Sequence, residues 1–184
     1  MKKLLMLVVL VASLGVAAAA ESPIKLSLYD NIAWPKPNHT NIVLGLIDSN
    51  TPTVSGVALT IGSTRVNNMT GLSWAWIYTR SNNLTGVQWG GLYHVTKNVT
   101  GVTGGLVNHN KGKFTGVQLG LVNLANNAKG VQWGFVNVAQ RFSGLQLGVV
   151  NYINRIDRGL QIGFVNIIEH NGLLPVFIIA NGKF

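Results

Sequence analysis

The stretch GVQLGLVNLANNAKGVQWGFVNVAQRFSGLQLGVVN, from Gly116 to Asn151, decides the fold because it carries nearly the same unit three times. The unit reads G-φ-Q-φ-G-φ-φ-N, where φ is an apolar residue, and a more polar stretch of six or seven residues follows it. A constant period of this kind is typical of an array of equivalent structural units. The unit starts, 14 or 15 residues apart, are Asn41, Gly56, Gly71, Gly86, Gly101, Gly116, Gly130, Gly144 and Gly159.

Each unit has the pattern of a short strand. Apolar and polar residues alternate over its first six positions, valine, leucine and phenylalanine are frequent, and glycine or asparagine punctuates each half-unit. Two architectures use such a unit: a β-solenoid, in which each repeat is one coil, and an up-and-down outer-membrane β-barrel, in which each repeat is one strand. Membrane barrels alternate short turns with long loops, whereas the connections here are nearly equal in length. We therefore predict an all-β, single-domain β-solenoid of about nine repeats, with the barrel as the alternative.

Stacked coils place identical side chains above one another at about 4.8 Å. Buried amides in such a column bond along the axis and satisfy one another. The fourth unit position is different, because Trp74, Trp89 and Trp133 are too large for the interior of a 15-residue coil. We expect these residues to face outward and to leave an apolar stripe for a membrane, a partner or a second copy. The predicted ladder residues are Asn108, Asn123, Asn137, Asn151, Asn166, Gln118, Gln132, Gln146 and Gln161.

The N-terminal segment MKKLLMLVVLVASLGVAAAAES has the layout of a secretory signal peptide, with two lysines, an apolar run and small residues up to Ala20. We expect residues 1–20 to be removed and the protein to be exported to the cell surface, the outer membrane or the extracellular space. Loss of both leader lysines lowers the formal charge from +9 to +7. The expected organisation is an N-terminal cap (21–40), a repeat domain (41–170) and a C-terminal cap (171–184).

The repeats TGVQLGLVN (115–123) and GLQIGFVN (159–166), with the ending NGLLPVFIIANGKF (171–184), resemble a poorly characterised group of secreted bacterial surface-repeat proteins. This resemblance covers residues 41–184, implies export and a repeat architecture, and transfers no activity. A weaker likeness is to curli-type fibre subunits, because the pattern Q-x-G-x-x-N-x-A occurs at residues 118–125 and 132–139. It implies a subunit that assembles into fibres.

Catalytic and metal-binding patterns are missing from the sequence. No nucleophile motif or phosphate loop is present, and the chain contains no cysteine. His94 and His109 share the ninth unit position and are predicted to stack, but two imidazoles make an incomplete metal site. We expect no enzyme activity, no cofactor and no metal. The carboxylates beyond the leader are too widely separated for an acid–base pair, at Glu21, Asp30, Asp48, Asp157 and Glu169.

Large aromatic residues concentrate in two adjacent repeats. The segment WAWIY is predicted to place Trp74, Trp76 and Tyr78 on one strand face, with Trp89 and Tyr93 in the next coil. These five residues are the candidate ligand site, a platform on which sugars of a surface glycan stack. A hydrophobic cluster or a membrane-interface belt uses the same residues equally well.

The sequence favours a non-enzymatic scaffold or adhesion module of the cell surface or envelope. Its partner is expected to be a surface glycan or an acidic envelope polymer, with membrane association as a further option. The basic residues are scattered and no nucleic-acid-binding motif accompanies them, so a specific nucleic acid is not implied. The alternatives are an outer-membrane barrel, a fibre subunit and an ice-binding rod, the last suggested by the column Thr70, Thr85, Thr100 and Thr115. The oligomeric state stays open.

Overall fold

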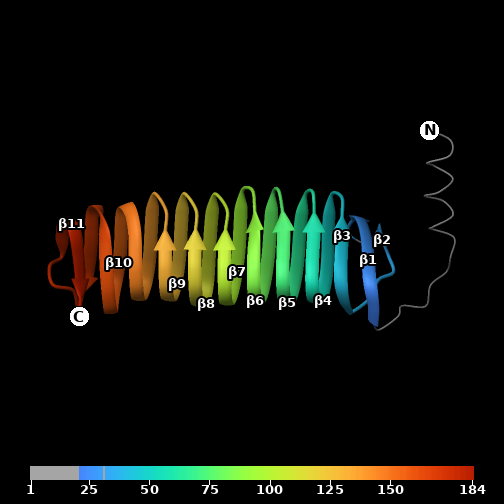
Figure 1. Cartoon of the computed structure of the whole chain (residues 1–184), viewed down its shortest axis with the longest axis horizontal. Coiled ribbons are helices and arrows are strands. Elements are labelled where there is room, and N and C mark those ends of the chain that lie inside the picture. The colour runs from blue at the N-terminus through green and yellow to red at the C-terminus, as the bar shows by residue number, and fades with distance from the viewer. Residues whose placement is uncertain (1–20, 31) are drawn as a thin grey trace.

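The computed structural model describes residues 21–30 and 32–184, which form a straight rod of stacked β-coils (Figure 1). The predicted β-solenoid is confirmed, and the barrel alternative is wrong. Consecutive strands from β3 to β10 pair in parallel, and the sheet is open, with the order β11-β10-β9-β8-β7-β6-β5-β4-β3-β1-β2. The predicted signal peptide lies outside the described residues.

Each strand fills most of one coil, and β10 continues without interruption through the last coils. In Figure 1 the strands rise on the front of the rod, a bend crosses the top, and the chain descends behind. The strands are β1 (Glu21–Tyr29), β2 (Ile32–Trp34), β3 (His39–Gly45), β4 (Asp48–Thr60), β5 (Ser63–Ala75), β6 (Tyr78–Gly90), β7 (Tyr93–Gly104), β8 (Val107–Leu119), β9 (Val122–Trp133), β10 (Val136–His170) and β11 (Val176–Lys183).

Both ends of the stack carry an antiparallel strand. At the N-terminal end β1 pairs in parallel with β3, and β2 then pairs antiparallel with β1. At the other end β11 runs antiparallel to the last part of β10. These strands occupy the hydrogen-bonding edges that the terminal coils of a parallel stack otherwise leave open.

The unit-starting glycines lie in register and are required by the backbone. Gly101 pairs with Gly86 and Gly116, and its φ of 140° belongs to a region that L side chains rarely adopt. A Cβ atom on Gly101 would also overlap the carbonyl oxygen of Gly86. The glycine column therefore lets the chain turn into each new coil while neighbouring backbones stay closely packed.

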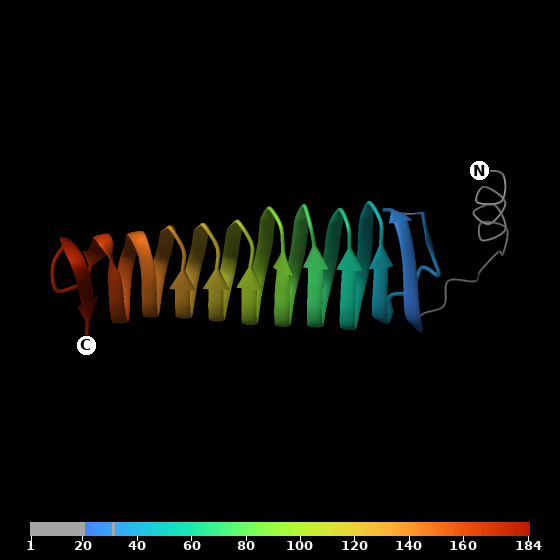
Figure 2. The same cartoon turned by 45° about the horizontal axis from the view of Figure 1, so that its top comes forward.

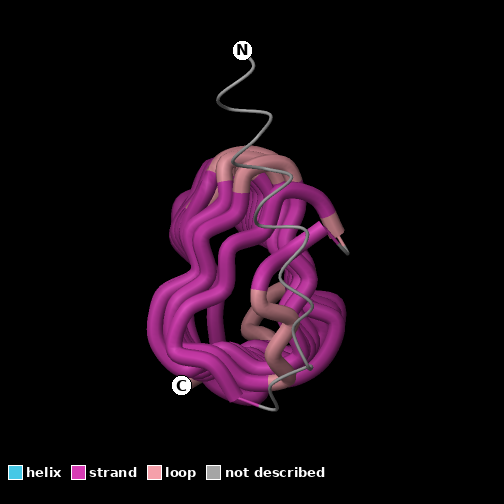
Figure 3. Tube along the Cα trace, turned by 90° about the vertical axis from the view of Figure 1, so that its right-hand side faces the viewer, coloured by secondary structure: helices cyan, strands magenta, loops and turns pink. Residues whose placement is uncertain are grey.

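Each coil has two halves of opposite polarity, and residues 130–143 show both. From Gly130 to Asn137 the inward side chains are the amides Gln132 and Asn137, while Trp133 and Phe135 point outward. We name this segment, and its equivalent from the starting glycine onward in every coil, the inverted half. It contains the bend, and Figures 2 and 3 show the bends of successive coils aligned along one narrow edge of the rod.

The remainder of each coil has the polarity of an ordinary water-soluble protein, and we name it the ordinary half. In residues 138–143 the inward side chains are Ala139 and Phe142, and the outward ones include Gln140 and Arg141. Ala128 continues this apolar core into the preceding coil and Phe114 into the coil before that, and Ile156 belongs to the same core. The hydrophobic core therefore lies mostly in the ordinary half, and amide ladders fill the inverted half.

Candidate functional site

The asparagine column forms a continuous hydrogen-bonded ladder. Asn108 Nδ2 donates to Asn123 Oδ1 at 2.9 Å, and the same bond repeats from Asn123 to Asn137, from Asn137 to Asn151 and from Asn151 to Asn166 at 2.8–2.9 Å. Each of the first four side chains also donates to a backbone carbonyl, at 2.9–3.0 Å. Both amide hydrogens are thus used, so these fully buried groups carry no unpaired donor.

The glutamine column runs beside it with the opposite direction of donation. Gln132 Nε2 donates back to Gln118 Oε1 at 2.7 Å, and Gln146 and Gln161 continue the chain at 2.6 and 2.8 Å. The column ends where Thr103 replaces glutamine, and there the Thr103 hydroxyl and Gln118 Nε2 have no hydrogen-bond partner among the described residues. The two ladders fix the register of the coils and make the stack rigid.

The predicted stacking of His94 and His109 is wrong. His94 lies opposite Asn108 in the inward column and is buried, whereas His109 lies opposite Val95 and faces outward. The coil that starts at Gly101 uses one residue fewer at its bend, so counting from the glycine misaligns the two histidines. Among residues 21–30 and 32–184, no group of three or more metal-binding side chains comes together.

His94 takes the place of an asparagine in the inward column. Its Nδ1 is hydrogen-bonded to the Thr79 hydroxyl, and Gln88 Nε2 lies 3.5 Å away. Burial lowers the pKa of His94, and burial together with nearby Lys111 lowers the pKa of His109. Both imidazoles are therefore neutral at pH 7.

The five aromatic residues of the predicted ligand site do not share one face. Strand β5 ends at Ala75 and β6 begins at Tyr78, so the bend lies within the WAWIY segment. Trp74 pairs with Trp89 near the ends of β5 and β6, and Tyr78 pairs with Tyr93 at the starts of β6 and β7, beyond the bend. The prediction of a single platform is wrong, because the alternation on which it rested is interrupted by the bend.

Two separate aromatic contacts replace that platform. The rings of Trp74 and Trp76 meet edge to face with centroids 5.7 Å apart. Tyr78 and Tyr93 stack at 6.0 Å, and the Tyr93 hydroxyl lies 3.0 Å from His109 Nδ1. Each contact joins neighbouring side chains along the outer surface of the rod.

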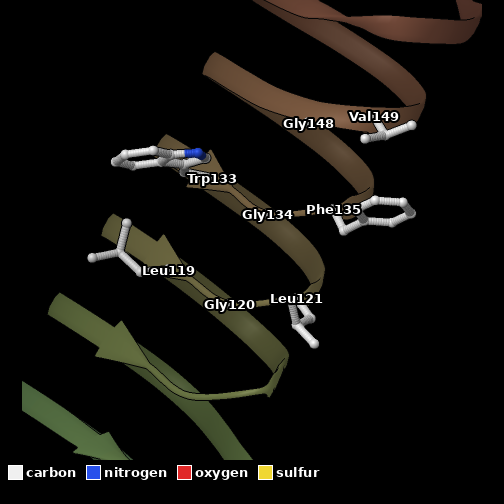
Figure 4. Close-up of a pocket in the computed structure, with 8 residues that line it drawn as sticks. All are labelled: Leu119, Gly120, Leu121, Trp133, Gly134, Phe135, Gly148 and Val149. Atoms are coloured by element: carbon white, nitrogen blue, oxygen red, sulfur yellow. The ribbon is translucent and has the colours of Figure 1, made fainter.

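An apolar surface covers the bend edge. Trp133 is 63% exposed, as expected for the fourth unit position, and Phe135 at the bend is 59% exposed. Figure 4 shows how outward side chains on both sides of the bend surround the glycines at its centre. The residues that line this shallow depression are Leu119, Gly120, Leu121, Trp133, Gly134, Phe135, Gly148 and Val149. The exposed bend residues are Leu46, Ile47, Ile61, Trp76, Ile77, Leu92, Leu106, Leu121, Phe135, Val149 and Phe164.

The outer surface of the ordinary halves is polar and, from Lys97 onward, basic. Its cations belong to the ordinary halves, and the nearest carboxylate to Arg141 is Asp157, at 3.8 Å. We name the exposed cations the basic edge: Lys97, Lys111, Lys113, Lys129, Arg141, Arg155 and Arg158. Sequence reasoning treated these residues as scattered, because their shared edge depends on how the coils stack.

A buried lysine lies at the N-terminal end of the stack, and the sequence analysis did not identify it. Lys25 Nζ donates to the Thr51 hydroxyl at 3.0 Å and to the carbonyl of Asn50, and burial lowers its pKa. Nearby, Arg65 pairs with Asp48 and with Asp30. These polar contacts bind the first strand to the repeats.

No family model, curated protein or solved structure matches this chain. In the described part of the chain, no helix is long and apolar enough to span a membrane.

Proposed function

We propose that the chain is an exported, non-enzymatic scaffold and adhesion module of the cell surface or envelope. One observation carries the proposal: a rigid rod has two long edges of opposite chemistry, one apolar and one basic. The amide ladders hold the coils in register, so apolar residues recur at the bends along the rod and cations recur in the ordinary halves from Lys97 onward. Such a repeated surface favours multivalent contact with an extended partner.

The partner proposed for the basic edge is an acidic envelope polymer, such as a carboxylated polysaccharide. The seven exposed cations all lie in ordinary halves, and they attract a polyanion over a distance that salt limits to about 8 Å at physiological ionic strength. Because a bend separates Trp74 from Tyr78, the proposed glycan contact rests on charge at the basic edge.

Alginate binding tests this proposal, with neutral dextran as the comparison polymer. The triple variant Lys111→Gln, Lys113→Gln, Arg141→Gln should bind alginate roughly tenfold more weakly, and added salt should weaken wild-type binding. The matched control removes three cations elsewhere, with Lys36→Gln, Arg80→Gln and Lys183→Gln, and should bind like the wild type. Equal loss in both variants, or equal binding to dextran, would contradict a specific basic edge.

A second candidate function is ice binding. Asn83 Nδ2 donates to Asn68 Oδ1 at 2.8 Å, and Asn98 repeats the bond to Asn83 at 3.0 Å, so an ordered amide row lies on the outside. A register-aligned row of exposed threonines accompanies it, at Thr70, Thr85, Thr100 and Thr115. Wild-type protein should then show thermal hysteresis that Thr85→Lys abolishes, and a melting curve without hysteresis excludes the function.

A further inference from the structure

We propose that the rod lies lengthwise on a membrane, with its inverted halves inserted into one leaflet of a bilayer that contains anionic lipids. The inference deepens the envelope function proposed above and rests on export, but it does not depend on the basic edge binding a polymer.

The first argument is the chemistry of the outer surface. Outward positions of the inverted half carry only apolar residues or glycine from the front strands to the bend in the described coils. Phe164, Trp133 and Trp76 are each more than half exposed. Monomeric soluble proteins rarely expose a continuous apolar patch of more than a few hundred Å², so a partner or a membrane is expected to cover this one. The alternation of apolar residues outward with polar residues inward is the pattern of lipid-facing strands.

The second argument is the state of the backbone at the bends. Irregular backbone cannot face hydrocarbon unless its polar groups are paired. Here the bends bond to one another along the rod: Leu92 N donates to Trp76 O at 3.1 Å, Leu106 N to Gly91 O at 2.9 Å, and Val136 N to Leu121 O at 2.9 Å. Within the ladders the inward amides bond to one another from coil to coil, and the unpartnered amide atoms Asn108 Oδ1, Gln118 Nε2 and Gln161 Oε1 belong to the terminal residues of the two columns. The bend edge can therefore move from water into hydrocarbon while these backbone N–H groups keep their hydrogen bonds.

The third argument is depth. Five residue steps separate Gly130 from Phe135, about 16 Å of extended chain. On the descending side, Arg80 follows the bend residue Ile77 by three steps, about 10 Å. The hydrocarbon core of one leaflet is about 15 Å thick, half of the roughly 30 Å of a whole bilayer. The apolar surface is thus deep enough to enter one leaflet and too shallow to span two.

The fourth argument is charge and shape at the border of the apolar surface. Lys129 and Arg158 are the two cations of the basic edge that immediately precede starting glycines, so they lie next to the apolar surface, and Arg65 and Arg80 follow the bend on the descending side. Of these, Arg65 is paired with Asp48 and Asp30, and the others complement anionic headgroups. The bends also form a convex edge of the rod with a strand segment on either side (Figure 3). A second rigid rod can cover one flank, whereas fluid lipid can cover both.

Flotation tests the proposal on vesicles of phosphatidylethanolamine and phosphatidylglycerol in a 7:3 ratio. The exported protein should float with the vesicles, and acyl-brominated lipids should quench its tryptophans, because Trp74, Trp76, Trp89 and Trp133 all lie in inverted halves. Leu121→Glu with Phe135→Glu should reduce flotation at least tenfold. The control Asn127→Glu with Gln140→Glu adds the same charge to exposed positions in the ordinary halves of the same two coils and should float normally.

Three results would overturn the proposal. Wild-type protein could stay unbound, or it could bind without quenching by acyl bromines, which places it on headgroups alone. Alternatively, sedimentation could give twice the monomer mass with no flotation, which assigns the apolar surface to a second copy. The quenching measurement uses wild-type protein and stands even if the Glu variants fail to fold. Failed flotation with retained alginate binding would reject the leaflet and leave the envelope function standing.

Discussion

Replacing Asn137 with leucine tests whether the amide ladder stabilises the rod. Asn137 is fully buried, accepts a hydrogen bond from Asn123 Nδ2, and donates to Asn151 Oδ1 and to the Leu147 carbonyl. Leucine has a similar volume but makes none of these bonds. The substitution therefore removes one hydrogen bond from each of three groups, Asn123 Nδ2, Asn151 Oδ1 and the Leu147 carbonyl, of which the carbonyl still accepts from Gly134 N at 3.0 Å.

The expected loss of stability follows from those three groups. Each buried group left unsatisfied costs about 1–3 kcal/mol, and burial of the leucine side chain returns about 1.5–3 kcal/mol. Partial compensation by the second bond of Asn123 and by local relaxation reduces the total, so we expect a net destabilisation of about 3 kcal/mol.

Urea denaturation followed by circular dichroism measures this loss. The matched control is Asn127→Leu, at an exposed position of the coil before, which should change stability by about 0.5 kcal/mol or less. If Asn137→Leu shifted the urea midpoint no more than the control, the ladder hydrogen bonds would not contribute to the free energy of unfolding, and our reasoning would be refuted.

Three further predictions address the backbone, the buried imidazole and export. Gly116→Ala should destabilise the protein by more than about 2 kcal/mol in urea denaturation, because a Cβ there meets the carbonyl of Gly101 at a φ of 140°; a variant as stable as wild type would contradict the close approach. His94 has a lowered pKa in the fold, so its share of stability should be complete above the unfolded value of 6.5 and decline as the pH falls below it. His94→Asn should remove that decline, which thermal melts between pH 5 and 8 measure, and should supply a donor for the unpartnered Asn108 Oδ1; an unchanged pH profile would argue against the buried imidazole. Mass spectrometry of exported protein should find an N-terminus close to Glu21, and a retained Met1 would reject cleavage.

The period of the sequence was sufficient to predict the stack and the ladder residues. In a solenoid each coil contacts the equivalent positions of its neighbours, so a repeated residue at a fixed step becomes a tertiary contact. Asn123, Asn137 and Asn151 are therefore readable as neighbours from sequence alone. The same reasoning predicted that Trp133 faces outward, because the interior of a short coil cannot hold an indole.

Local irregularities limited the prediction of the candidate site. The coil starting at Gly101 loses one residue at the bend and regains one at Gly112, so its length stays 15 while its register changes in between. Counting cannot locate such a compensated change, which is why His94 and His109 were placed in one column. The bend at Trp76 likewise divides the aromatic residues, since β-alternation carries no sign of where a strand ends.

The sequence by itself determined that the chain alternates, repeats and stacks, because those properties follow from composition at each unit position. Only the tertiary structure decided where each coil bends, and it confirmed the inward side of each strand that the bulk of Trp133 indicated. The alternation of a strand does not specify which of its two faces is buried. Hydrophobicity taken alone favours burial of the face that carries Val131 and Trp133. The closed ladder of Gln132 and Asn137 reverses that preference, because these amides satisfy one another only when they are stacked inside the coil. The apolar edge on the outside is the consequence of that choice.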